Sequence, residues 1–248
     1  MTVIKSPQEV AIMRQAGKIV AAVLQKLREE IRPGIKTRQL DSVAMSELQK
    51  YGAKASFKGY RGFPAHLCVS VNDEIVHGIP GERWLGEGDI VSVDFGAIVG
   101  GFHGDGAITV GVGRINSKAQ ELLAVTEAAL MAGIKAARCG NHLGDISAAI
   151  QSYVETRGFC VVREYSGHGV GRDLHEDPLV PNFGSPGDGP LLQKGMTLAL
   201  EPMVTAGHWR TRLAKNRWTV LTADGSLSAH FEHTIAIDEG EPEILTLL

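Results

Sequence analysis

The chain has 248 residues, of which 44% are apolar and 21% charged, with a formal net charge of −3. This composition allows one sizeable core and gives no electrostatic reason for tight binding to nucleic acid or to an anionic membrane. Three widely spaced cysteines without a Cys-x-x-Cys pair disfavour a disulfide framework and favour a reducing compartment. Neither a signal-peptide pattern nor an uninterrupted run of 18 apolar residues is present, so we expect a cytoplasmic protein.

The N-terminal part predicts two helices. Ser6-Pro7-Gln8-Glu9 has the pattern of a capping box with proline in the first turn, and apolar residues follow at helical spacing as far as Leu27. This helix is expected to stop near Arg32-Pro33-Gly34. A second helix is expected from Thr37, as its N-cap, to Gly52.

The same order of elements recurs about 106 residues later. Ser117 is the predicted cap of a helix that runs to about Arg138, and Asp145 is expected to begin a shorter helix. We therefore predict one domain, 1–248, with an internal pseudo-repeat at roughly 5–113 and 117–248. The helix-breaking glycines coincide in this alignment: Gly34 with Gly140, and Gly52 with Gly158.

Four carboxylates stand at equivalent places in the two predicted halves. The alternating strands 88–94 and 195–201 end at Asp94 and Glu201, while Asp105 and Glu232 each open another strand. The second half is about twenty residues longer, and we expect these residues to form a β-hairpin within 215–230. Together these patterns indicate an α+β fold in which strands of two pseudo-symmetric halves face each other.

A two-fold relation between the halves would bring these four carboxylates together. Their mutual repulsion would be relieved by cations, and two divalent ions about 3.5 to 4 Å apart match four carboxylates. His168, held among glycines in 166–171, is the expected fifth ligand. Such a set suits Co, Mn, Fe or Zn and does not choose among them. A single aspartate near a strand end, or one glycine-flanked histidine, is usually structural, so the prediction depends on the combination.

Two other histidines lie in loops rich in glycine or proline. His77 and His175 are expected to contact a substrate or developing negative charge, with an ordinary surface position as the alternative. No function is assigned to the remaining six: His66, His103, His142, His208, His230 and His233.

Five motifs together resemble the type I methionine aminopeptidases. The resemblance spans nearly the whole chain and is strengthened by segments 71–80 and 226–229. It implies the pita-bread fold in its minimal, bacterial form, with antiparallel sheets covered by helices, and removal of N-terminal methionine ahead of small residues. The motifs are VDFG at 93–96, FHGD at 102–105, GHGVG at 167–171, LEPM at 200–203 and FEHT at 231–234.

The resemblance also implies individual roles. Asp94 would bind one metal ion, Asp105 and Glu232 would be shared by both ions, and His168 and Glu201 would complete the other site. His77 and His175 would contact the substrate. The chain departs from the usual family pattern at Leu174, where an aromatic residue is common, and at Gly106, where a small hydroxyl residue is common. The residues implied around the methionine side chain are Tyr60, Phe63, Cys68 and Trp218.

The activity implied is that of a metallo-exopeptidase in which water is activated by a dinuclear metal centre and Glu201 is the general base. One alternative is a proline-specific aminopeptidase or dipeptidase of the same fold, which would share all five ligands. Another is a non-catalytic interaction protein with the pita-bread fold. The expected partners are the N-termini of nascent polypeptides, with the ribosome as a candidate docking site. We expect a monomer that contacts neither membrane nor nucleic acid directly.

Overall fold

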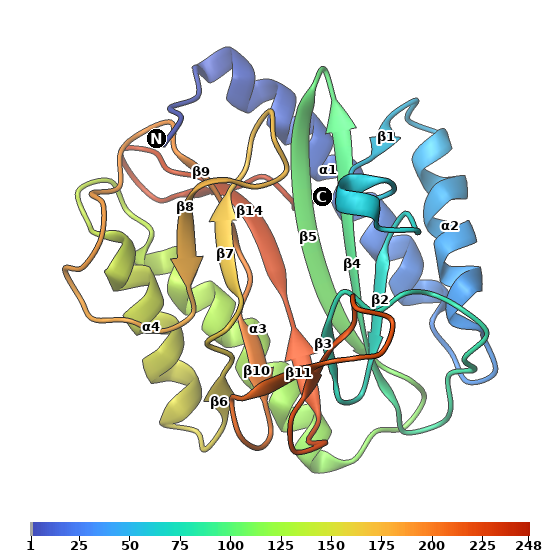
Figure 1. Cartoon of the computed structure of the whole chain (residues 1–248). Helices are drawn as coiled ribbons and strands as arrows, with labels where there is room; N and C mark the ends of the chain where they lie inside the picture. Colours follow the sequence, from blue (N-terminus) through green and yellow to red (C-terminus); the bar gives the residue numbers. More distant parts are fainter. Residues whose placement is uncertain (1) are drawn as a thin grey trace.

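Four α-helices pack against a large antiparallel sheet in this computed structural model, which describes residues 2–248 (Figure 1). The sheet has nine strands: β1-β4-β5-β14-β9-β7-β8 in order, with β2 also paired to β4 and β15 to β14. Two smaller sheets, β13-β10-β6 and β11-β12-β3, lie beside it. The helices are α1 (Pro7–Glu30), α2 (Thr37–Gln49), α3 (Ser117–Ala136) and α4 (Leu143–Glu155), and Tyr60–Gly62 form a short 3-10 turn, η1.

The strands vary widely in length, and the longest two, of ten residues each, are neighbours in the large sheet. They are β1 (Lys54–Ala55), β2 (Cys68–Val71), β3 (Glu74–Val76), β4 (Ile90–Val99), β5 (Phe102–Gly111), β6 (Cys160–Val161), β7 (Ser166–Gly169), β8 (Glu176–Pro181), β9 (Thr197–Leu200), β10 (Met203–Thr205), β11 (Thr211–Leu213), β12 (Val220–Thr222), β13 (Ser228–His230), β14 (Glu232–Ala236) and β15 (Glu243–Ile244).

The start of α1 is confirmed in detail. The Ser6 hydroxyl accepts a hydrogen bond from the Glu9 amide, and the Glu9 carboxylate accepts one from the Ser6 amide. This reciprocal pair satisfies two helix-end donors, and Pro7 needs none at the first helical position. The helix ends at Glu30, two residues before the predicted stop.

The predicted starts of the other three helices were each wrong by one or two residues. Lys36, not Thr37, is the N-cap of α2, because the Thr37 hydroxyl exchanges hydrogen bonds with the backbone of Gly81. Asn116 caps α3 with its side chain, which accepts from the Ala119 amide. Asp145 lies inside the first turn of α4, where its carboxylate reaches back to the His142 amide. Asp145 is the third residue of α4, and an acidic side chain at this position stabilises a helix N-terminus as well as an acidic N-cap residue does.

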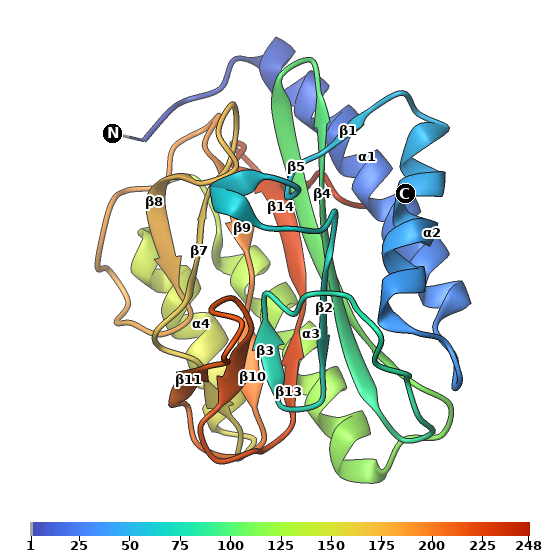
Figure 2. The same ribbon diagram turned by 45° about the vertical axis from the view of Figure 1, so that its right-hand side comes forward.

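Each pair of helices covers its own apolar core. One core joins α1 and α2 to strands β2 and β4, and the other joins α3 and α4 to strands that include β6, β9 and β14. Figure 2 shows α1 and α2 on the side of β4, with α3 and α4 behind β9 and β14. The element order of two helices followed by strands of the large sheet thus occurs twice, while the repeat boundaries at 5–113 and 117–248 stay a prediction.

Strand ends were predicted less well than helices. β4 runs on to Val99 and β5 begins at Phe102, so Asp94 and Asp105 lie inside a hairpin of two ten-residue strands rather than at strand ends. The hairpin expected within 215–230 is wrong, because β12 pairs with β11 and β3 while β13 pairs with β10. Glu232 does open β14, as predicted.

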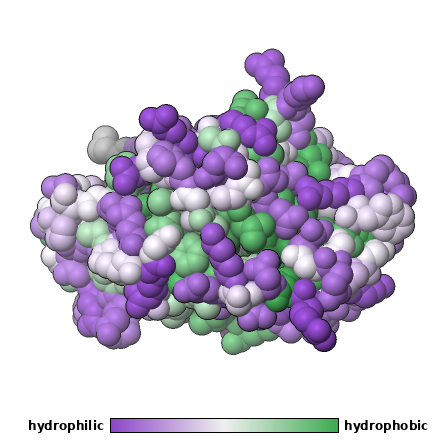
Figure 3. Space-filling model, turned by 90° about the horizontal axis from the view of Figure 1, so that it is seen from below, coloured by the Kyte–Doolittle hydropathy of each residue, from purple (hydrophilic) through white to green (hydrophobic). Residues whose placement is uncertain are grey.

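Within residues 2–248, no helix combines the length and apolar character that crossing a bilayer requires. Hydrophilic side chains form most of the outline of the face seen in Figure 3, and apolar ones gather toward its middle.

Candidate active site

Strand register brings all five predicted metal ligands to one face of the sheet. Asp94 is paired with Ala107 across β4 and β5, and Ala107 is paired with Glu232 across β5 and β14. Asp105 precedes Ala107 by two residues and therefore points the same way. On the other side, His168 is paired with Ala199, which is paired with Thr234. Glu201 follows Ala199 by two residues, and Glu232 precedes Thr234 by two.

The junction between β5 and β14 is fixed by a side chain. The Thr234 hydroxyl accepts a hydrogen bond from the Asp105 amide at 2.9 Å and donates one to the Asp105 carbonyl at 2.8 Å. Ligand atoms of Asp105, His168 and Glu232 consequently lie within 4.8 Å of one another, and all three residues are buried. Glu201 joins them through its Oε1, which is 3.4 Å from His168 Nε2.

These side chains share one cavity of about 140 Å³. Every residue that was predicted to act in the site lines this cavity. Three further residues line it as well: Phe57, Arg61 and Leu174. The predicted residues that line it are Asp94, Asp105, His168, Glu201 and Glu232, the histidines His77 and His175, and the pocket residues Tyr60, Phe63, Cys68 and Trp218.

The carboxylates carry more negative charge than their surroundings compensate. Burial raises the pKa values of Asp94, Glu201 and Glu232 well above their usual range, and repulsion among the carboxylates raises them further. Burial also raises the pKa of Asp105, to about 7. Asp94 Oδ1 and Glu232 Oε1 are buried without any hydrogen-bond partner. Divalent cations would supply both the missing charge and the missing contacts, so these residues fit a metal centre.

His168 is prepared to act as a neutral nitrogen ligand. Its Nδ1 lies 2.8 Å from the carbonyl oxygen of Gly169, which can only accept, so Nδ1 carries the proton and Nε2 keeps a lone pair toward Glu201. Burial lowers the pKa of His168 to about 4. The flanking glycines are required by space, because a Cβ at Gly167 or Gly169 would lie 2.3 Å from a backbone oxygen of a neighbouring strand.

His175 lies beside the metal-site residues at the mouth of the cavity. Its ring centroid is 4.1 Å from that of His168, and its Nδ1 is hydrogen-bonded to the Tyr60 hydroxyl at 2.8 Å. The Tyr60 ring also stacks on the imidazole, with a centroid distance of 5.2 Å. Partial burial and the neighbouring His168 lower the pKa of His175, which favours the neutral ring at neutral pH.

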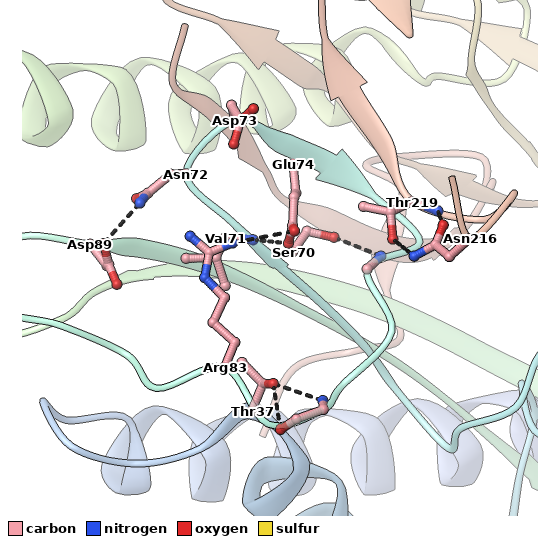
Figure 4. A network of polar contacts seen from close by, with 12 residues as sticks. Thr37, Ser70, Val71, Asn72, Asp73, Glu74, Arg83, Asp89, Asn216 and Thr219 are labelled. Carbon is pink, nitrogen blue, oxygen red and sulfur yellow. Dashed lines mark hydrogen bonds and ion pairs between the residues drawn. The ribbon is translucent and has the colours of Figure 1, made fainter. Parts of the chain in front are cut away.

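His77 is held in an unusual backbone conformation by the network behind it. Its φ is +61°, in the left-handed region that non-glycine residues rarely occupy. The next residue is fixed because the Gly78 amide donates to Ser70 Oγ, and the His77 carbonyl accepts from the Thr219 hydroxyl at 3.4 Å. Figure 4 shows this network, in which the Thr219 hydroxyl also accepts a hydrogen bond from the Asn216 side chain. In the same view, the Thr37 hydroxyl accepts one from the Gly81 amide in the loop that follows His77. Burial lowers the pKa of His77.

An apolar cluster closes the cavity on the side of η1. Phe57, Phe63 and Leu174 pack together with Cys68, and the Phe63 ring meets Trp218 edge to face at 5.2 Å. Cys68 is the strand partner of Asp94 and is buried, which raises the pKa of its thiol well above normal and keeps it protonated. Leu174, the first departure from the family pattern, is thus part of the wall.

The second departure, Gly106, also has a structural explanation. A Cβ added there would lie 3.1 Å from Val20 Cγ1 and 3.4 Å from the Glu232 carbonyl oxygen. Helix α1 therefore packs so closely on β5 that a larger residue at this position would require Val20 to move.

One residue that the sequence left without a role lies next to the carboxylates. His230 is 1% exposed, and its Nε2 is 3.8 Å from Glu201 Oε2 and 3.9 Å from Glu232 Oε2. The available signal was its position two residues before Glu232, since alternate residues of an extended segment share a face. Glycine- or proline-rich loops drew attention to His77 and His175, and His230 has no such setting.

Comparison with known proteins agrees with this geometry. Residues 11–239 match the model of metallopeptidase family M24. The chain is 52% identical to a methionine aminopeptidase of Clostridium perfringens over all of both chains, and 53% identical to methionine aminopeptidase 1 of Bacillus subtilis over 99% of both. It superposes on the crystal structure of a methionine aminopeptidase from Thermotoga maritima with a TM-score of 0.99 at 48% identity, covering both chains completely. The expected pita-bread fold is thereby confirmed. The chain belongs to metallopeptidase family M24 and, within it, to the methionine aminopeptidases.

Proposed function

We propose that this enzyme removes the N-terminal methionine from nascent polypeptides whose second residue is small, at a centre of two divalent metal ions. The observation that carries the proposal is the placement of four carboxylates and one neutral imidazole on a single sheet face, beside an apolar pocket. Family membership alone supports divalent metal use. The number of ions and the role of each ligand are our inference.

The ions would be held by Asp94, Asp105, His168, Glu201 and Glu232, with Asp105 and Glu232 shared. When bound, divalent ions supply Lewis-acid chemistry, which polarises a carbonyl and lowers the pKa of water. The mostly oxygen donor set with one imidazole suits Co, Mn, Fe or Zn equally well.

Protein groups would move the protons of the reaction. Glu201 lies at the edge of the cluster, 3.4 Å from His168, and is our general base: it takes the proton of the attacking water and delivers it to the departing amide nitrogen. His175 donates a hydrogen bond from Nε2 to the developing oxyanion, because its Nδ1 is already engaged by Tyr60. His77, which also lines the cavity, contacts the substrate.

The apolar cluster would select methionine. Phe63, Trp218 and Tyr60 offer ring faces and edges to a thioether, a contact that favours sulfur over an aliphatic group of similar size. The protonated thiol of Cys68 adds a small apolar surface at the base of the pocket. The second residue of the substrate would have to be small.

The cellular setting follows from the substrate. An enzyme that trims initiator methionine would act in the cytoplasm, on N-termini as they leave the ribosome. We infer that it works there as a monomer, because every predicted ligand comes from one chain.

A peptide panel tests the activity directly. With Mn²⁺ or Co²⁺ we expect hydrolysis of Met-Ala and Met-Gly peptides, little or none of Xaa-Pro peptides, and loss of activity with a chelator. Preference for Xaa-Pro would instead favour the proline-specific alternative, and inactivity with every metal would favour the non-catalytic one.

The variant Glu201→Gln should stay folded, as judged by circular dichroism, and lose turnover. Full activity in that variant would remove Glu201 from the mechanism.

A further inference from the structure

The side chain of His230 is buried with one nitrogen unused. Its Nε2 has no hydrogen-bond partner and no contact with solvent. The two polar atoms across from it are carboxylate oxygens, Glu201 Oε2 at 3.8 Å and Glu232 Oε2 at 3.9 Å. A buried polar atom of this kind is costly unless it acquires a partner, and both available partners are predicted metal ligands.

Only one tautomer suits this position. Carboxylates accept hydrogen bonds, so an Nε2 lone pair would face two further sets of lone pairs and repel them. A proton on Nε2 turns the same geometry into attraction toward both oxygens. Either contact would become a hydrogen bond if the carboxylate oxygen moved toward the ring by a few tenths of an ångström to about 1 Å.

The backbone of His230 cannot easily move away. Its amide donates to the Thr109 hydroxyl at 2.8 Å, and that hydroxyl donates to the His230 carbonyl at 2.7 Å. Thr109 is in turn 2.9 Å from the Ser92 hydroxyl on β4. Strand β13 is also paired with β10, where Met203 opposes His230. The imidazole is therefore held at a fixed distance from the two carboxylates by strands of both halves.

We propose that His230 is a positioning residue, whose Nε2–H orients the carboxylates of Glu201 and Glu232 and so sets the affinity of the centre for divalent metal. The inference rests on the proposed function in taking these two residues as ligands. Groups that donate to ligating carboxylates commonly change metal affinity by about 10- to 100-fold when they are removed.

Three variants separate this role from a merely structural one. His230→Leu removes the donor, and His230→Gln keeps an N–H at a similar reach. His233→Leu is the matched control, because His233 is a partly buried imidazole that is also close to Glu232 in sequence but points to the opposite face, where its Nδ1 contacts Thr246. Binding of Mn²⁺ is measured by isothermal titration calorimetry on each protein after metal removal.

We expect His230→Leu to bind Mn²⁺ about 10- to 100-fold more weakly, and His230→Gln and His233→Leu to stay within about threefold of the original chain. Unchanged affinity in His230→Leu would overturn the proposal, as would equal weakening in His233→Leu. If His230→Leu fails to fold, nitrogen NMR of the Zn²⁺-loaded original chain decides the matter, with the His230→Gln spectrum assigning the signal. A proton on Nε2 of His230 supports the proposal, and an unprotonated Nε2 contradicts it.

These readouts are independent of peptide hydrolysis. A chain that bound Mn²⁺ but cleaved no methionine peptide would refute the proposed activity, while the comparison among the three variants would still report on His230.

Discussion

Among single residues, the pair of Tyr60 and His175 shows most clearly how a contact can set reactivity. The Tyr60 hydroxyl occupies His175 Nδ1 at 2.8 Å, which leaves Nε2 as the nitrogen available to the substrate. A hydroxyl can either donate or accept, so it permits the Nε2–H form that oxyanion stabilisation needs. In our proposal Tyr60 would therefore act in two ways, through its ring in the pocket and through its oxygen on His175.

Two substitutions distinguish these two actions. His175→Ala should lower kcat by about 10²- to 10³-fold, the usual loss when one oxyanion donor is removed. Tyr60→Phe keeps the ring and the apolar wall, so it should lower kcat more than it changes KM for a Met-Ala peptide. Steady-state kinetics measures both. A Tyr60→Phe variant with normal kcat and a raised KM would mean that Tyr60 acts only through the pocket.

At the level of elements, the N-terminal segment before α1 is joined to the loop that carries His175. Lys5 Nζ lies 2.5 Å from Glu176 Oε2, and the two side chains are only 2% and 10% exposed. Glu176 also accepts from the Asp173 amide, so the ion pair reaches into the turn that precedes His175. Removing one partner of a buried ion pair leaves the charge of the other partner buried without an opposite charge beside it.

Lys5→Met should therefore destabilise the protein by about 3 to 5 kcal/mol, measured by urea unfolding. The control is Arg14→Met, which breaks an ion pair with Glu243 whose side chains are 39% and 40% exposed. That variant should lose no more than about 1 kcal/mol. Equal losses in the two variants would show that burial of the Lys5 pair adds nothing.

The sequence predicted elements well where local residues decide them. The α1 capping box and the glycine breaks are local signals, and they predicted the bounds of both helix pairs to within three residues. Strand ends depend on partners far away: β4 reaches Val99 because β5 pairs with it along its full length. The hairpin expected within 215–230 was wrong for the same reason, since β12 and β13 find partners elsewhere.

The residues of the candidate site also differ in whether local sequence could predict them. Carboxylates at equivalent places in a repeat could be recognised without a structure, and so could a histidine among glycines. His230 had only the signal of its position two residues before Glu232, because its contact with Glu201 depends on the pairing of β13 with β10. The pocket residues Tyr60 and Trp218 were placed by family resemblance alone, since their meeting requires η1 and the segment before β12 to come together.

For the whole molecule, the unpaired acidity of the site should make the metal-free protein sensitive to pH. The pKa of Asp105 is raised to about 7, so the folded state holds a proton that the unfolded chain gives up near pH 4. The stability that this proton provides is complete below about pH 4 and is lost as pH rises toward 7. Buried His168 and His230, whose pKa values are lowered to about 4 and 3, act in the opposite sense.

Comparison with Asp105→Asn cancels the histidine contribution, because both proteins contain it. Between pH 5 and 7, in chelator, the original chain should lose stability relative to Asp105→Asn by up to about 1.4 kcal/mol per pH unit. Urea unfolding at several pH values measures this difference. A difference that did not vary with pH would mean that Asp105 is already ionised in the metal-free fold.

The sharing of ligands between distant strands also affects how the enzyme is made. Asp94 and Asp105 belong to a hairpin that is complete by residue 111, whereas Glu232 follows more than a hundred residues later and is held next to them only by the pairing of β5 with β14. A chain still being translated therefore cannot assemble the centre until synthesis has passed residue 232. With Asp94, Asp105 and Glu232 as the metal ligands we propose, each new copy of this enzyme stays inactive until β14 has paired with β5.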